Sequence, residues 1–332
     1  MQTLVIGDIH GCYIELLALL EKAGLSDDDS IIAVGDIVDR GPETPQVLDF
    51  FQQTPNARTL MGNHERKHVR GARHEVRLAL SQLISQQQFG DSYPDAVAWM
   101  GTLPLYIELA ETVIVHGYLE PGIPLAEQNP SVVCGTMGGD NILRERYERP
   151  WYEYYNGDKP VIVGHNNYNG TDQPFVYNDK VVGLDTDCVH GKPLTGLLLP
   201  AFRFISVPSR GNLWAQVCRT YQRPLVLSQK PFFSWSAQDD LSLMQLIEKV
   251  RQANDALLAL LQSTPGFSEL TPRLQAKLYA ARAEAGKGKY ANLMQLARLN
   301  KLDLVMGRKI LKDPKEVQRL LPMRISEPKN DI

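Results

Sequence analysis

The chain has 332 residues, more than one typical domain core needs, so its length predicts a main domain with a smaller one attached. Its hydrophobic content of 43% and charged content of 22% are ordinary for soluble globular proteins and argue against a disordered chain or a membrane protein. The sequence shows no signal peptide and no apolar run long enough to span a membrane, so we expect a cytoplasmic protein with no membrane partner.

The first two thirds of the chain alternate short β-branched runs with helical stretches. The runs predicted as buried strands are bounded by Gly, Asp or His and cover residues 3–6, 31–34, 112–115, 161–163 and 181–184. Between the first two runs, apolar residues at helical spacing end at Gly24, which predicts a strand, helix, strand unit. Polar residues follow the strand ends, where open α/β sheets bind their ligands.

The last third of the chain has a different pattern. Residues 209–235 look irregular, with Arg223-Pro224, Lys230-Pro231 and an aromatic cluster at 232–235 that we expect to pack between domains. Beyond them, an apolar stripe over 243–261 and polar caps at Ser236, Thr271 and Asp313 predict helices. We therefore predict a main α/β domain over 1–208, a connecting segment over 209–235 and a smaller α-helical domain over 236–332.

The charge of the chain is unevenly distributed. The net charge is −3, yet residues 271–332 hold 14 Lys and Arg against 6 Asp and Glu. Such a basic segment is compatible with a nucleic-acid partner, but a solvated helix surface explains it more simply, so nucleic-acid binding is not favoured.

Three polar segments, each after a predicted strand, indicate the chemistry of the chain. They read Gly7-Asp8-Ile9-His10-Gly11, Gly35-Asp36-Ile37-Val38-Asp39-Arg40-Gly41-Pro42 and Gly62-Asn63-His64-Glu65. Asp36 follows Asp8 by 28 residues and Asn63 follows Asp36 by 27, which fits one strand and one crossover helix each time. Two later histidines, His116 and His165, also follow predicted strands. The loops of the three segments are therefore expected at one sheet edge.

Together these segments offer carboxylate, imidazole and amide oxygen ligands. This mixture suits borderline divalent ions such as Mn²⁺, Fe²⁺ or Zn²⁺, whereas an all-oxygen set favours Mg²⁺ or Ca²⁺. A carboxylate that bridges two cations would hold them about 3.5–4 Å apart, and Asp36 is the natural bridge. We expect two divalent ions, with Mn²⁺ favoured and Fe, Zn, Ni or Co as alternatives.

The three segments and the two histidines resemble the calcineurin-like metallophosphoesterase superfamily over residues 1–207. The second segment is most similar to the branch of Ser/Thr phosphoprotein phosphatases and their bacterial relatives, which include symmetrical diadenosine tetraphosphatases. The resemblance implies a β-sandwich of two mixed sheets flanked by helices, with the metal centre at one edge.

The resemblance also implies a role for each matching residue. Asp8, His10 and Asp36 would bind the first metal, and Asp36, Asn63, His116 and His165 the second. His64 would be the general acid, oriented by Asp39, and Arg40 would grip phosphate oxygens. A second phosphate-binding arginine is expected at Arg144 or Arg146, between which the sequence does not decide.

Three functions are compatible with these residues. The first is hydrolysis of phosphate monoesters, in phosphoproteins or small molecules, by in-line attack of a metal-bridging hydroxide. The second is hydrolysis of dinucleoside polyphosphates or nucleotide caps, and the third is a non-catalytic metal-binding scaffold. Retention of all the ligands argues against the scaffold.

Two other segments are interpreted without a role in the metal centre. His68 and His74 lie in a basic run and are expected on a solvated helix face. The segment 183–192 resembles the closing segment of the family, in which glycines usually replace Asp187 and Lys192. We expect His190 at the rim of the site and Cys188 in the packing.

Overall fold

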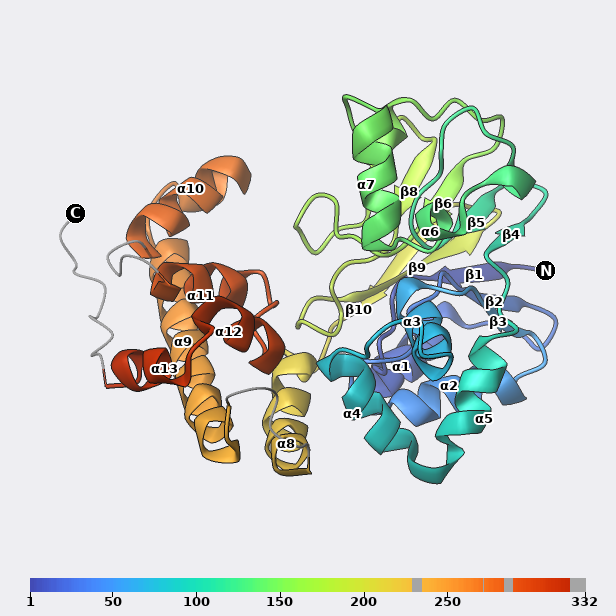
Figure 1. The fold of residues 1–332 in the computed structure, drawn as a ribbon. Helices are drawn as coiled ribbons and strands as arrows, with labels where there is room; N and C mark the ends of the chain where they lie inside the picture. Colours follow the sequence, from blue (N-terminus) through green and yellow to red (C-terminus); the bar gives the residue numbers. More distant parts are fainter. Residues whose placement is uncertain (229–234, 271, 284–288, 323–332) are drawn as a thin grey trace. The chain divides into compact units, whose positions relative to one another are not determined.

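The computed structural model describes residues 1–228, 235–270, 272–283 and 289–322 (Figure 1). The chain divides into two compact units, Met1–Arg219 and Thr220–Ile332, and each is described by itself. The sequence features noted at Lys230, Pro231, Phe232, Phe233 and Thr271 lie outside the described residues. None of the described helices combines the length and the apolar composition needed to cross a membrane.

Two five-stranded sheets form the centre of the first unit. The first has the order β10-β9-β1-β2-β3, with bounds β1 Thr3–Ile6, β2 Ser30–Ala33, β3 Ala57–Thr59, β9 Leu194–Leu199 and β10 Arg203–Val207. The second has the order β4-β5-β6-β8-β7, with bounds β4 Tyr106–Glu108, β5 Val113–Val115, β6 Val161–Val163, β7 Phe175–Tyr177 and β8 Val181–Gly183. In each sheet three neighbouring strands are parallel, β1, β2 and β3 in one and β5, β6 and β8 in the other.

The two sheets share one apolar core because alternate side chains of each strand point to the same face. Its buried residues are Val5, Ile32, Val34, Leu60, Ile107, Ile114, Ile162, Val182, Leu184, Leu197 and Leu199. Helices cover the other faces: α1 (Tyr13–Ala23) packs on β9 and β10, and α2 (Thr44–Gln53) on β3 (Figure 1). Helices α6 (Pro130–Val133) and α7 (Met137–Arg146) bury apolar residues against the second sheet. The predicted α/β sandwich is confirmed.

Three further helices stand between β3 and β4. They are α3 (Asn63–Ala72), α4 (Leu80–Phe89) and α5 (Tyr93–Met100), with a 3-10 turn, η1 (Gly90–Ser92), before α5. Helix α3 contacts both α4 and α5, so the three form a small bundle directly after the third polar segment. Two more 3-10 turns, η2 (Leu125–Glu127) and η3 (Trp151–Glu153), lie in the loops around α6 and α7.

The five strands predicted from the sequence are all present, with ends that shift by at most one residue. Strand β3 was expected before Gly62 but without bounds, and four other strands, β4, β7, β9 and β10, were not predicted. Strand β9 is rich in leucine and contains Gly196, so its own residues favour a strand weakly. It becomes a strand because it pairs with β1 on one side and β10 on the other.

The second unit is helical and has its own core. Its helices are α9 (Ala237–Gln262), η4 (Phe267–Glu269), α10 (Pro272–Ala283), α11 (Lys289–Arg298), α12 (Leu304–Leu311) and α13 (Pro314–Leu320). Ser236 caps α9, where its Oγ accepts from the Asp239 N–H at 3.1 Å, and Asp313 caps α13, as predicted. The predicted stripe on α9 packs into this core, with Met244 and Leu258 only partly buried, and Trp235 joins the same core.

The segment 209–235 differs from its prediction. Helix α8 (Leu213–Ser228) occupies most of it, although the sequence there was expected to be irregular. The interpretation gave too much weight to Arg223-Pro224, because apolar residues at Leu213, Trp214 and Val217 recur at helical spacing and are buried.

Candidate dimetal centre

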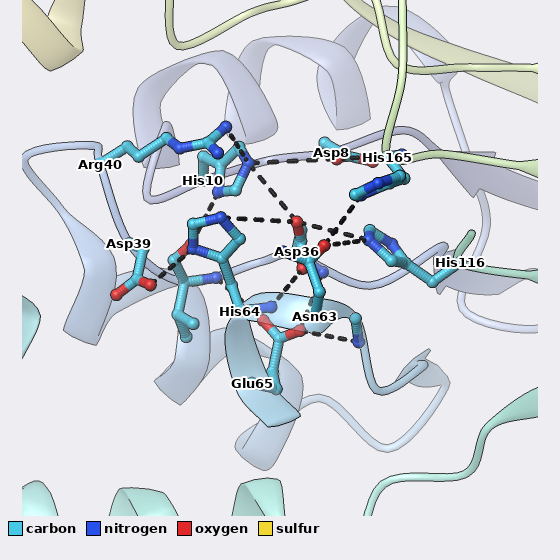
Figure 2. Close-up of polar contacts among 12 residues, drawn as sticks. Asp8, His10, Asp36, Asp39, Arg40, Asn63, His64, Glu65, His116 and His165 are labelled. Atoms are coloured by element: carbon cyan, nitrogen blue, oxygen red, sulfur yellow. Dashed lines mark hydrogen bonds and ion pairs between the residues drawn. The ribbon is translucent and has the colours of Figure 1, made fainter. Parts of the chain in front are cut away.

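The structure brings the six predicted metal ligands together at the carboxyl ends of the parallel strands. Asp8 follows β1 and Asp36 follows β2, while Asn63 is the first residue of α3. His116 and His165 follow β5 and β6 of the other sheet. The site therefore lies beyond the carboxyl ends of parallel strands of both sheets, and Figure 2 shows the six side chains converging there.

Asp36 occupies the middle of this group. Its Oδ2 lies 3.7 Å from His10 Nε2 and 3.4 Å from His116 Nε2, and these histidines stand on opposite sides of it (Figure 2). Two clusters of possible metal ligands share this carboxylate, one with His10 and His64 and the other with His116 and His165; within each, the ligand atoms all lie within 4.8 Å of one another. The geometry thus agrees with a bridging position for Asp36.

The remaining predicted ligands complete the two clusters. Asn63 Oδ1 accepts from His116 Nε2 at 3.0 Å and from His165 Nδ1 at 2.9 Å. Asp8 Oδ2 lies 4.0 Å from His10 Nε2, and Asp8 Oδ1 accepts from the backbone N–H of His165 at 3.0 Å. The sequence interpretation assigned Asp8, His10 and Asp36 to the first metal. In the structure, the first cluster contains His64 in place of Asp8, and His64 Nε2 lies 3.9 Å from Asp36 Oδ2.

These separations fit divalent cations. Metal bonds of about 2.0–2.2 Å place neighbouring ligand atoms roughly 3–3.5 Å apart. Most pairs above lie close to that range, and the others need only small side-chain shifts. The backbone also prepares two of the histidines, because Val38 O accepts from His10 Nδ1 at 2.8 Å and leaves Nε2 directed into the site. His116 Nδ1 faces Val34 O in the same way, at 3.2 Å.

The electrostatics of the site also favour a cation. Burial raises the pKa of Asp8 well above its ordinary value, and the nearby carboxylate of Asp185 raises it further. Burial alone would lower the pKa of His116, but the carboxylate of Asp36 outweighs this and raises it to about 9. Several acidic groups are therefore buried close together. A bound cation would reduce the repulsion between their negative charges.

His64, the predicted general acid, stands beside these clusters. Its Nδ1 lies 2.6 Å from Asp39 Oδ2, so its Nε2 is turned towards Asp36. Arg40 extends along the same side of the site, where its Nη1 donates to His10 Nε2 at 2.9 Å (Figure 2). Both predicted positions are consistent with groups that act on a phosphate held over Asp36.

The structure separates the two candidate arginines of α7. Arg146 Nη1 is paired with the buried carboxylate of Glu120. The Arg144 side chain is 76% exposed, and its Nη2 pairs with Asp140 Oδ2 at 2.8 Å, one helical turn away. Burial raises the pKa of the Tyr118 phenol to about 12, and the charge of Arg144 acts in the opposite direction. The rings of Tyr118 and His165 meet edge to face, with their centroids 5.4 Å apart.

Comparison with known proteins agrees with this geometry. The family model described as calcineurin-like phosphoesterase matches residues 1–184. This chain belongs to that family. The calcineurin-like phosphoesterase is therefore a hydrolase of phosphate ester or anhydride bonds, and its family implies divalent metal ions. The alternative of a non-catalytic scaffold, which the sequence already argued against, is not supported.

Individual relatives extend the comparison. A bis(5'-nucleosyl)-tetraphosphatase PrpE [asymmetrical] of Halalkalibacterium halodurans is 30% identical over 255 residues, which cover 67% of this chain and 99% of that protein. The protein of the same name in Bacillus subtilis is 28% identical and covers 62% and 93%. A crystal structure provisionally named a diadenosine tetraphosphatase is 23% identical with a TM-score of 0.50, covers 63% of this chain and 93% of its own, and supports the fold alone.

One prediction about the phosphoesterase is wrong. His68 is not on a solvated face: it is completely buried, and its Nε2 lies 2.8 Å from Asp39 Oδ1. It lies on α3 one turn after His64, so both rings reach the same carboxylate. His74, beyond the end of α3, is exposed as expected.

Other residues at the site received no role from the sequence. Glu65 is fully buried, and its carboxylate accepts from the N–H groups of Asp36, Ile37, Val38 and Gly62 at 2.9–3.2 Å. Its position in the third motif, directly after His64, is the sequence feature that could have indicated a role for Glu65. Gln82 and Ser85 of α4 both donate to Asp39, and no pattern in the sequence marks them.

The closing segment lies at the site as expected. Lys192 Nζ pairs with Asp187 Oδ2 at 3.1 Å, and Asn167 Nδ2 donates to the same oxygen at 3.2 Å. These bonds join the segment to the loop after β6. Burial and the charge of Arg40 lower the pKa of His190 to about 4. Cys188 is buried.

Proposed function

We propose that this calcineurin-like phosphoesterase hydrolyses dinucleoside polyphosphates, cleaving one phosphoanhydride bond asymmetrically. The sequence interpretation put phosphate monoesters first and dinucleotides second. The names of the relatives favour the second, because those proteins are called asymmetrical bis(5'-nucleosyl)-tetraphosphatases. They also differ from the symmetrical enzymes with which the sequence was first compared.

The observation that carries the proposal is the shared carboxylate of Asp36, with possible ligands on both sides. Asp8, His10 and Asp36 would hold one divalent cation, and Asp36, Asn63, His116 and His165 the other. We propose Mn²⁺ because the imidazole, carboxylate and amide ligands suit a borderline ion. When bound, the two cations supply a nucleophilic water at neutral pH and neutralise phosphate charge.

The remaining side chains act on the substrate. Arg40 and Arg144 present guanidinium groups that bind the non-bridging oxygens of a polyphosphate, which carries several negative charges. His64 donates its Nε2 proton to the departing phosphate, while Asp39 accepts from Nδ1 and holds the ring. Activity in a reducing cytoplasm also agrees with the thiols, since no disulfide occurs in the described chain, which includes all four cysteines.

The test compares three substrates with purified protein and added Mn²⁺: diadenosine tetraphosphate, a phosphopeptide and a simple aryl phosphate. We expect the highest kcat/KM for diadenosine tetraphosphate, with ATP and AMP as products. His64→Ala should lower kcat by about 10²–10⁴-fold, whereas the exposed His74→Ala should leave it unchanged.

Two results would contradict the proposal. A higher kcat/KM for the phosphopeptide or the aryl phosphate would restore the monoesterase interpretation. Formation of two ADP molecules would retain the dinucleotide substrate but reject asymmetrical cleavage.

A further inference from the structure

The Asp39 carboxylate is enclosed by hydrogen-bond donors from two helices. It is fully buried, and each of its oxygens faces two donors. His68 Nε2 lies 2.8 Å from Oδ1 and Ser85 Oγ lies 2.5 Å from it, while His64 Nδ1 and Gln82 Nε2 bond to Oδ2. Because an ionised carboxylate only accepts, all four groups must donate.

The proton positions of His68 follow from its neighbours. Its Nε2 must carry hydrogen to donate to Asp39, and the hydroxyl of Tyr93, on α5, lies 2.9 Å from its Nδ1. Burial and the charge of Asp39 together raise the pKa of Tyr93 to about 12, so its O–H stays protonated and can donate to Nδ1. The chain of donors therefore runs from Tyr93 through His68 to Asp39.

Gln82 is also fixed in orientation. Its Oε1 accepts from the Ala79 N–H at 3.2 Å at the start of α4, which leaves its Nε2 for Asp39. Gln82 Nε2 is 3.2 Å from His64 Nδ1, but both nitrogens carry hydrogen here and both bond to the same oxygen. Two donors on each oxygen leave the carboxylate a single orientation.

This arrangement matters because the torsion that rotates an aspartate carboxylate is broad and roughly two-fold. If Oδ1 lost its donors, the carboxylate would rotate, and its bond to His64 Nδ1 would lengthen or bend. His64 would then no longer aim Nε2 at one place over Asp36. Misplacing a catalytic group by about 1 Å can lower the rate of reaction about 100-fold.

We propose that His68, supported by Ser85 and Tyr93, is a positioning residue that locks the Asp39 carboxylate and thereby holds His64 towards the leaving phosphate. The inference deepens the proposed function and rests on it for the role of His64. Among the described residues, the hydrogen bonds of the His68 ring go to Tyr93 and Asp39 and to none of the predicted metal ligands.

The first test uses the metal-free protein and needs no activity. Proton NMR of protein labelled with ¹⁵N-histidine should show a downfield Nδ1–H signal for His64, bonded to Asp39, and an Nε2–H signal for His68. In His68→Leu, the His64 signal should broaden or move upfield. His68→Gln, which can place an amide N–H near the same point, should keep it, as should the exposed control His74→Gln. An unchanged His64 signal in His68→Leu overturns the inference.

The second test measures kinetics with diadenosine tetraphosphate and Mn²⁺. We expect His68→Leu to lower kcat about 10- to 100-fold with KM unchanged, and His68→Gln to recover most of it. In a His64→Asn background, His68→Leu should have no further effect, because both act through one proton donor. Additive losses in the double variant, or a rise in KM alone, would indicate general damage and reject the positioning role. Failure of the wild type to hydrolyse any substrate would count against the proposed function, while the NMR result would still decide this inference.

Discussion

At the scale of single residues, several residues of the site have backbone conformations that residues other than glycine rarely adopt. His10, Asp36, Asp39, Arg40 and His165 have φ angles between 46° and 72°, in the left-handed region. Each such residue costs on the order of 1–3 kcal/mol and persists only where its surroundings enforce it. These backbone turns aim the side chains inward from loops that are only a few residues long.

Glu65 is the residue that enforces the turn at Asp36. Its carboxylate accepts four backbone N–H groups, three of them from consecutive residues beginning at Asp36. Gly62 is needed for the same contact, because a Cβ there would overlap Oδ1 of Asp36.

Glu65→Gln should therefore destabilise the protein and loosen the metal site. One carboxylate oxygen becomes an amide nitrogen that faces backbone donors, and each buried N–H left without an acceptor costs about 1–3 kcal/mol. We expect a loss of about 3 kcal/mol in the free energy of unfolding, measured by urea denaturation, and weaker Mn²⁺ binding by calorimetry. Glu75→Gln is the control, because Glu75 is 44% exposed in a surface pair with Arg70. Equal losses in both variants would show that Glu65 does not hold the turn.

The residues of the site were predictable to different degrees. The six ligands, His64, Asp39 and Arg40 could be named because motif residues follow strands at spacings that one crossover allows. His68, Gln82 and Ser85 could not, because on helices they look like ordinary polar positions. Only the packing of α4 against α3 shows that they face one buried carboxylate. The choice between Arg144 and Arg146 likewise depended on Glu120, which the sequence does not place.

At the scale of elements, an ion pair ties α1 to the segment after β10. Arg210 donates to the Glu15 carboxylate from its backbone N–H and its Nε, both at 3.0 Å, and to Glu43 from Nη2 at 2.9 Å. Burial of Glu15 would raise its pKa, but the hydrogen bonds from Arg210 outweigh burial and lower it.

This pair predicts a defined loss of stability in acid. Because the pKa of Glu15 is lower in the folded state than its ordinary value of 4.5, its stabilisation is complete above about pH 5 and disappears as the pH falls through the folded-state pKa. Since Arg210 is 41% exposed, we expect only about 1 kcal/mol. The difference in free energy of unfolding between wild type and Glu15→Gln should be constant from pH 5 to 8 and shrink below pH 4.5. Glu21→Gln, exposed on the same helix, should show no such change.

Helices and strands were predictable where their own residues determine the secondary structure. Strands β1 and β6 and helix α9 have strong apolar patterns, and α9 also has a cap at Ser236. Strands β9 and β10 and helix α8 were missed. The strands depend on pairing with distant segments, which no local pattern encodes. Helix α8 was missed because proline at 224 was interpreted as a break, although the helix continues to Ser228.

At the scale of the whole molecule, the two units have separate apolar cores. Every proposed ligand and the Asp39 network belong to Met1–Arg219, while the core of the second unit consists of residues between Trp235 and Val317. A protein built in this way can lose one core without losing the other. The sequence predicted that the second unit is helical. The basic charge of residues 271–332 is the one sequence feature that bears on the function of this unit.

The second unit depends on an ion pair between α9 and α12. Arg308 Nε donates to Asp240 Oδ1 at 2.7 Å; the Asp240 side chain is 4% exposed and that of Arg308 is 18% exposed. Asp240→Asn removes the negative partner and leaves a mostly buried guanidinium without compensation. Breaking a buried pair costs about 3–5 kcal/mol, and the partial exposure of Arg308 reduces this to about 2–3 kcal/mol.

Calorimetry should therefore show that Asp240→Asn lowers one unfolding transition and leaves the other in place. Hydrolysis and Mn²⁺ binding should be unchanged at 25 °C, because the substitution lies far along the chain from every proposed ligand and within a different core. The exposed Glu269→Gln is the matched control and should alter neither transition. If Asp240→Asn instead shifted a single common transition, the two units would unfold together, and hydrolysis would become sensitive to damage in the helical unit. Parallel measurements of Mn²⁺-dependent protection would then identify which transition contains the dimetal site, since a bound ligand stabilises only the unit that holds it.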